Sequence, residues 1–458
     1  MATCRPAVGY PYWCLVDPKR MDHLYIDANN MFAVVEPYVT VAQLQAEAMK
    51  VGLFIGSAGT GTQTSALATN IFTNSHWTGW RTGKGRGLLG MEIVLPDGEI
   101  LRTGSLILDQ GNYAWGEGPG SDARGLFRGG SGPKGALGMV TRAAVKLFPW
   151  PGPVVWPTEG VQPEKVSVLP CDTFKTIIFS HATIEDCVEC IREIGEAEIG
   201  GVVLQCHPYE LVGLVTRSRE EFWRKWQEPF WQEQIHHRHM TFVTLWGYAG
   251  VGQIEYEEKV LEDIISDTKG RLIPEEEATW LRDEITASAV RDTHRMRYAR
   301  MGKAVSIGSS ADSLYDALRS LSLSRAALKK FSPPLGDGAL FDRGQNQHKM
   351  TLADFGRTAT AGVAPFSEKS EEFETFMKTQ VNRYVKELRK GKSIFAPGDA
   401  DDAISSGKRF ANIHLLIASI KKTLDPENIA NPTRLIDLKN IDDSVKNDWD
   451  GSNTSGEE

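Results

Sequence analysis

The chain has little cysteine and no long apolar run. Six cysteines in 458 residues are sparse for this length, and such usage fits reduced thiols in the cytoplasm. We find no run of roughly 18 apolar residues and no charged-then-apolar pattern at the start of the sequence, so nothing predicts a membrane span or export.

Positive charge is also not in excess. The formal net charge is -8, which argues against nucleic acid as a partner, because binding a phosphate backbone needs a basic surface. The chain is 41% hydrophobic and 24% charged. With this length, the composition predicts two or three folded units with ample core.

Candidate metal ligands are few and incomplete. Cys187 and Cys190 form the one spaced cysteine pair, which is either half of a metal or cluster site or two small apolar residues on one helix face. His237 and His239 would point the same way on a strand, but no carboxylate completes a set nearby. The core and exposed-strand interpretations are favoured, and we predict no metal site.

The segment from Gly90 to Trp150 is the part around which the chain is organised. A hairpin is predicted, with Pro96-Asp97-Gly98 as its turn. A short helix from Ser121 to Arg128 and a strand from Met139 to Phe148 are expected to follow. Between these two lies a glycine cluster, where backbone can approach a flat or anionic ligand.

Upstream, the strand 33–37 leads to a helix that Thr40 caps and that ends near Val51. The following loop, 56–62, holds small and hydroxyl residues. It suits either close approach to a ligand or a surface turn.

Trp150-Pro-Gly-Pro153 marks a domain boundary. Strands and helices then alternate, which predicts an antiparallel α+β unit. A helix 413–424 has Leu415, Leu416, Ile417 and Ile420 as its apolar residues, and the acidic end of the chain is expected to be disordered. The expected strands are 174–179, 201–206 and 240–248, and the expected helices are 183–197, 220–234, 254–268, 274–301 and 312–323.

Several of these segments resemble a known family. "GMEIVLPDGEILRTGS" and "GALGMVTRAAVKLFPWPGP", with "IKKTLDPENIANPTRL" near the C-terminus, are similar to the vanillyl-alcohol oxidase and p-cresol methylhydroxylase (PCMH) flavoproteins. The glycolate- and D-lactate-dehydrogenase-like branch shares these segments. The resemblance implies the α+β class, with a PCMH-type FAD-binding domain and an antiparallel α+β cap domain.

The implied division is an FAD-binding domain over 1–153, a cap over 154–412, a segment 413–437 that returns to the flavin, and an acidic tail over 438–458. In relatives, an N-terminal subdomain holds the FAD diphosphate. We find no equivalent before "YPYWCLVDPKRMDHLYIDANN". We therefore expect a truncated gene product, a partner chain that supplies this piece, or incomplete FAD binding.

The resemblance also implies where FAD is bound. Ala68-Thr69 replaces the glycine pair of a segment that lines the flavin. His76 is open to three interpretations: a flavin neighbour, a covalent attachment point, or a polar loop histidine. The start of the strand at Met139 meets the adenine or ribose in relatives, and Asn431 or Arg434 would lie near the ring. The expected FAD-binding residues are Ser57, Gly59, Thr60, Asn70, Thr73, Asn74, His76, Gly138, Val140 and Asn431.

The catalytic candidates come from the cap. The His-Gly-Asp-Gly-Asn motif of branches that oxidise 2-hydroxy acids is absent, so a metal-assisted mechanism is not predicted. An arginine could bind a substrate carboxylate, with a solvated face as the alternative, and a histidine would serve as base. The candidates are Arg297, Arg300, His348 and Arg357.

Two functions follow. The first is an FAD-dependent oxidoreductase that moves a hydride from an alcohol, a 2-hydroxy acid or a phenolic substrate to the flavin. The second is an accessory or non-catalytic subunit of a two-part flavoprotein. The missing N-terminal piece, Ala68-Thr69 and the lost cap histidines favour the second.

Overall fold

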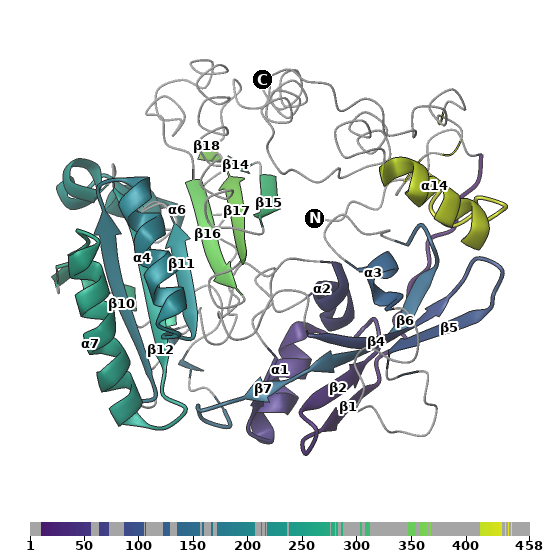
Figure 1. Ribbon diagram of the computed structural model, residues 1–458, viewed down its shortest axis with the longest axis horizontal. Helices are drawn as coiled ribbons and strands as arrows, with labels where there is room; N and C mark the ends of the chain where they lie inside the picture. Colours follow the sequence, from purple (N-terminus) through teal and green to yellow (C-terminus); the bar gives the residue numbers. More distant parts are fainter. Residues whose placement is uncertain are drawn as a thin grey trace.

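The computed structural model of the chain describes residues 11–55, 64–72, 87–104, 106, 122–128, 135–155, 158–159, 166–167, 172–206, 212, 216, 218–235, 238–274, 276–279, 281–282, 285–286, 303–304, 307–311, 347–353, 358–364, 366–367, 413–432, 436, 438 and 441. These residues form two large antiparallel sheets with helices packed on them, which lie on opposite sides of the view in Figure 1. The α+β class predicted from the sequence is confirmed.

The first sheet has five strands in the order β1-β2-β6-β4-β5. All neighbouring strands in this sheet pair antiparallel, and β6 is the central strand, between β2 and β4. The predicted hairpin turn is confirmed, since the amide of Gly98 donates to the carbonyl of Leu95 and Gly98 has φ +90°. The strands are β1 (Leu24–Asp27), β2 (Phe32–Val35), β4 (Leu88–Val94), β5 (Ile100–Gly104) and β6 (Met139–Lys146).

Four helices cover one face of this sheet, and their apolar side chains share one core with it. Alternate strand residues such as Val35, Met91 and Val145 enter that core, as the two-residue period of a strand requires. Phe32 and Ala144 face the other way, into a smaller cluster. The helices are α1 (Val41–Lys50), α2 (Ala66–Phe72), α3 (Arg124–Phe127) and α14 (Ile413–Leu424).

The start of α1 follows from local chemistry. The hydroxyl of Thr40 accepts from the amide of Gln43, and the side chain of Gln43 accepts from the amide of Thr40. This reciprocal cap satisfies two amides that the first turn leaves unpaired. The helix cap predicted at Thr40 is confirmed.

Two predicted boundaries are wrong by a few residues. Helix α3 begins at Arg124, after Ala123, and no side chain caps it; Ser121 lies outside the described residues. The strand predicted to run to Phe148 ends at Lys146, because the chain then leaves the sheet. It pairs instead as β7 (Phe148–Pro149) with β3 (Leu53–Phe54).

The second sheet has seven strands in the order β13-β10-β12-β11-β16-β17-β15. Helices α4 and α7 pack on one face, as Figure 1 shows. The cap of α4 at Thr183 is confirmed. The strands are β10 (Phe174–His181), β11 (Val202–Cys206), β12 (His239–Trp246), β13 (Arg271–Leu272), β15 (Ile307–Ala311), β16 (Gln347–Ala353) and β17 (Thr358–Ala364), and the helices are α4 (Ile184–Glu196) and α7 (Val251–Asp267).

One segment predicted as a single helix is interrupted. The segment expected to be helical from Glu220 to Gln234 is α6 (Arg219–Trp226) followed by a π-helical turn, Phe230–Ile235. The side-chain amide of Gln232 donates to the carbonyl of Trp226 at 2.6 Å, across the break.

Among the described residues between Pro274 and Met301, 276–279, 281–282 and 285–286 are helical. Short strand pairs join β8 (Thr158–Glu159) to β9 (Val166–Ser167) and β14 (Lys303–Ala304) to β18 (Phe366–Ser367).

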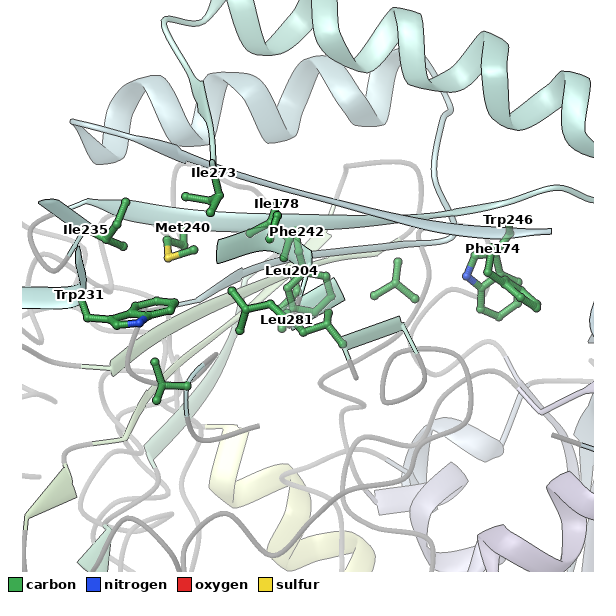
Figure 2. Close-up of a cluster of buried hydrophobic side chains, with 14 of the residues drawn as sticks. Phe174, Ile178, Leu204, Trp231, Ile235, Met240, Phe242, Trp246, Ile273 and Leu281 are labelled. Atoms are coloured by element: carbon green, nitrogen blue, oxygen red, sulfur yellow. The ribbon is translucent and has the colours of Figure 1, made fainter. Parts of the chain in front are cut away.

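An aromatic cluster joins the strand pair β3–β7 to the seven-stranded sheet. It consists of Phe54, Trp150, Phe174 and Trp246, and we call it the junction cluster. The ring centroids of Phe54 and Trp150 lie 5.3 Å apart in a stacked arrangement, and those of Phe54 and Trp246 lie 5.1 Å apart edge to face. Figure 2 shows Phe174 and Trp246 at one end of an apolar layer that continues along the same face of the sheet. This layer fixes the seven-stranded sheet relative to β3 and β7.

Helices α4 and α7 pack on the face of the seven-stranded sheet opposite to this apolar layer. Cys187 and Cys190 of α4 are fully buried there, and burial raises the pKa of each thiol to about 12. The interpretation of the pair as core residues is confirmed in so far as both are buried. Within the described ranges no group of three histidines, cysteines or acids could hold a metal ion.

His181 lies in this packed face as a neutral side chain. Its Nε2 is 3.2 Å from the hydroxyl of Thr268, whose single proton goes to the carbonyl of Ile264 at 2.7 Å. The hydroxyl oxygen therefore accepts, and Nε2 carries the proton. Burial, the largest cause, lowers the pKa of His181 to about 4.

The glycine beside the junction cluster is required for packing. A Cβ at Gly201 would lie 2.2 Å from a ring carbon of Trp246. We expect Gly201→Ala to lower the free energy of unfolding by roughly 1–3 kcal/mol, because the ring has to move. Urea unfolding measures the difference.

The matched control is Gly252→Ala in α7, where a Cβ would meet nothing within 4 Å. That variant should be neutral or slightly more stable, since alanine favours a helix over glycine. Equal stability of the two variants would contradict the packing account.

Stability should also depend on pH through His181. The unfolded chain takes up a proton at this histidine below about pH 6.5, whereas the folded chain does so only near pH 4. Stability is therefore full above about pH 6.5 and falls by roughly 1–3 kcal/mol as the pH drops toward 4. Urea unfolding between pH 7 and 4.5 should show a shallower fall for His181→Gln. Identical pH profiles for the two proteins would refute this.

Candidate functional site

The described part of the candidate site is built on the loop Gly135–Gly138, which leads into β6. Gly138 has φ +135°, and a Cβ there would lie 2.5 Å from the carbonyl oxygen of Val94. Gly135 has φ +83°, and a Cβ there would lie 2.6 Å from Nδ2 of Asn431. Both positions favour glycine because of their positive φ, and at Gly138 the backbone of β4 also leaves no room for a Cβ.

A buried lysine of α14 fastens the middle of the loop. The Nζ of Lys421 donates to the carbonyl of Ala136 at 2.8 Å, to Oδ2 of Asp425 at 2.8 Å and to the carbonyl of Ala430 at 3.0 Å. Lys421 and Asp425 are both fully buried. Burial lowers the pKa of Lys421, and the neighbouring carboxylate of Asp425 acts in the opposite direction.

Asp425 also shapes the chain after the helix. Its two carboxylate oxygens accept from the amides of Ile429 at 2.9 Å and of Ala430 at 3.0 Å. Asn428 and Asn431 take the left-handed conformation, with φ 52° and 41°, which asparagine tolerates better than most residues. This turn brings Asn431 to the loop.

An arginine clamp holds α3 on the first strand residue of β4. Arg124 binds the carboxylate of Asp122 with two N–H groups, at 2.7 and 3.0 Å, and donates to the carbonyl of Leu88 at 2.7 Å. Its guanidinium group, by hydrogen bonding above all, lowers the pKa of Asp122. Arg124 thus anchors the chain at the first residue of β4, and Gly138 lies against the other end of that strand at Val94.

Of the residues predicted to bind FAD, the structure brings Gly138 and Asn431 together at this loop. Val140 lies two residues further along, in β6, half-buried and paired with Ile93. Asn70 lies in α2 and His348 in β16, opposite Val363, but their side chains are not described. Ser57, Gly59, Thr60, Thr73, Asn74, His76, Arg297, Arg300 and Arg357 lie outside the described residues.

The sequence analysis missed Lys421, Asp425 and Arg124. Of the apolar residues predicted in the C-terminal helix, Ile420 packs against the core of the five-stranded sheet, and the buried residues of α14 are His414, Ala418 and Lys421. Leu416 is 49% exposed. The sequence signal that could have revealed the buried pair is a lysine followed four residues later by an aspartate, just before Pro426.

The described groups suit a neutral part of a ligand more than a charged one. The ammonium group of Lys421 is neutralised by Asp425 and its N–H groups are all used, so backbone is what the loop offers. No helix in the described part of the chain is long and apolar enough to cross a membrane.

Comparisons with known proteins find FAD-binding and FAD-linked proteins similar to this chain. A family model described as an FAD binding domain matches residues 13–104, which include β1 to β5. Glycolate oxidase subunit GlcD of Bacillus subtilis is 27% identical over 219 residues, which are 45% of this chain and 40% of GlcD. An uncharacterized FAD-linked oxidoreductase of Mycobacterium tuberculosis is 33% identical over 140 residues, covering 30% of this chain and 28% of the relative. The chain thus matches less than half the length of these curated relatives.

The fold has a counterpart among solved structures. p-Cresol methylhydroxylase with bound substrate superposes with a TM-score of 0.65 at 17% identity, covering 93% of this chain and 80% of that protein. This likeness shows that the predicted PCMH-type fold is correct. The chain is thus similar to an FAD binding domain over residues 13–104, to FAD-linked relatives over part of its length, and to p-cresol methylhydroxylase in fold.

Proposed function

We propose that the chain binds FAD and acts as an FAD-dependent oxidoreductase. The observation that carries the proposal is the match of the FAD binding domain to residues 13–104. That region supplies four of the five strands of the first sheet. The relatives in sequence are an oxidase subunit and an FAD-linked oxidoreductase, which supports oxidation as the reaction.

The proposed FAD site has a described and an undescribed part. In the described part, the backbone of Gly138 and Val140 would contact the adenine or ribose, and Asn431 closes the loop from the other side. In the other part, Ser57, Gly59 and Thr60 precede α2, and Thr73, Asn74 and His76 follow it. Asn70 belongs to α2 itself. These seven residues stay predictions.

The proposed substrate is a small molecule that gives up a hydride, namely an alcohol, a 2-hydroxy acid or a phenol. Its support is that glycolate oxidase and p-cresol methylhydroxylase are named among the proteins similar to this chain. FAD, when bound, supplies the hydride acceptor. The chain would orient the donor with Arg297, Arg300 or Arg357 and remove its proton with His348. The seven-stranded sheet that carries His348 would form the cap.

Several expectations from the sequence remain proposals. They are the domain limits at 153, 412 and 437, the cytoplasmic location, and a partner chain that contributes the FAD diphosphate site. A chain that needs this partner would take up FAD weakly by itself. A weak affinity for FAD would therefore support the accessory-subunit alternative.

The test is a visible absorption spectrum after incubation with FAD and gel filtration. The wild type should keep the flavin bands, which should bleach when a suitable alcohol, 2-hydroxy acid or 4-alkylphenol is added without oxygen. Gly138→Ala should bind FAD about tenfold more weakly, a loss of about 1.4 kcal/mol. The reason is that the new Cβ would push the loop off the carbonyl of Val94.

Gly98→Ala is the matched control. Gly98 also has a positive φ, +90°, but a Cβ there meets nothing within 4 Å, so FAD binding should be unchanged. A wild type without flavin bands after incubation would contradict the proposed function. Equal FAD affinity of the two variants would remove the loop Gly135–Gly138 from the site.

A further inference from the structure

We infer that Lys421 is a positioning residue of the FAD site. Its ammonium group fastens the C-terminal segment, residues 413–431, to the loop Gly135–Gly138. The inference rests on the proposed function, because it takes this loop as a wall of the FAD site.

Three separate pieces of the chain meet at one nitrogen. The N–H groups of Lys421 go to Ala136 in the loop, to Asp425 at the end of the same helix, and to Ala430 in the turn beyond it. An ammonium group has three N–H donors, so its hydrogen-bonding capacity is filled. Ala136 lies between the two constrained glycines, and the bond to its carbonyl therefore fixes the centre of the loop.

Apolar contact alone would not place the loop in this way. Ile420 and Leu424 of α14 already pack against the core of the five-stranded sheet, so the helix would stay docked without a charge at position 421. Burying an ammonium group is costly unless it is paired and hydrogen bonded. Dispersion contacts have little directionality, whereas three hydrogen bonds from one nitrogen fix the relative positions of three carbonyl or carboxylate oxygens.

The same contact holds Asn431 in place. Asp425, which Lys421 neutralises, accepts the amides of Ile429 and Ala430, and the next residue is Asn431. Nδ2 of Asn431 lies against Gly135. Loss of the ammonium group would therefore loosen both sides of the loop together, and Gly138 and Val140 with it.

The experiment compares three variants. Lys421→Met keeps the length and apolar stem of the side chain but leaves Asp425 buried without a counter-charge. Lys421→Met/Asp425→Asn removes both charges and retains a carbonyl oxygen that accepts from the turn. Lys422→Met, at the exposed next position, is the control. Far-ultraviolet circular dichroism establishes that each variant is folded.

Two measurements follow on the folded proteins: hydrogen exchange of the amides of residues 135–140 without FAD, and the Kd for FAD from quenching of its fluorescence. In the double variant we expect exchange at 135–140 to speed up about tenfold and the Kd to rise about tenfold. Exchange around Gly98 should not change. Lys422→Met should match the wild type in both measurements.

The outcomes separate this inference from the proposed function. Unchanged exchange at 135–140 in the double variant would overturn the role of Lys421 in holding the loop. Faster exchange with an unchanged Kd would overturn its role in the FAD site. A wild type that binds no FAD would overturn the proposed function itself, and with it the FAD part of this inference.

Discussion

The contact on which the arrangement of the molecule depends is the junction cluster. Phe54 lies in β3 and Trp150 directly follows β7, whereas Phe174 and Trp246 belong to the seven-stranded sheet. Aromatic pairs at these distances contribute about 0.5–1.5 kcal/mol each beyond the burial of their surface. Gly152 and Gly201 leave room for the rings of Trp150 and Trp246. The cluster therefore holds the seven-stranded sheet at a fixed place relative to β3 and β7, which the proposed cap would require.

Within the FAD domain, a second constraint prepares the loop that we assign to the cofactor. Strand β4 supplies the carbonyl of Val94 behind Gly138, and α14 supplies Lys421 and the turn that carries Asn431. A binding loop that is fixed before the ligand arrives loses little conformational entropy on binding. The C-terminal segment would therefore be part of the proposed site, although 285 residues separate Lys421 from Ala136.

The features that the sequence predicted well are local. The caps at Thr40 and Thr183 and the turn at Gly98 depend on residues within three or four positions. What could not be predicted depends on contacts between distant residues. The sequence suggested that the glycines make room for a ligand, but Gly135 and Gly138 make room for Asn431 and Val94. Likewise, the burial of Lys421 in α14 could not be predicted, because its acceptor, the carbonyl of Ala136, lies on a loop far away in the sequence.

The central claim is that the loop Gly135–Gly138, held between β4 and the C-terminal segment, forms one wall of an FAD site. A crystal structure of the chain grown with FAD tests it most directly. The account predicts the adenine or ribose in contact with the backbone of Gly138 to Val140, with Lys421 still bound to Ala136. FAD bound away from both Gly138 and Asn431 would contradict it.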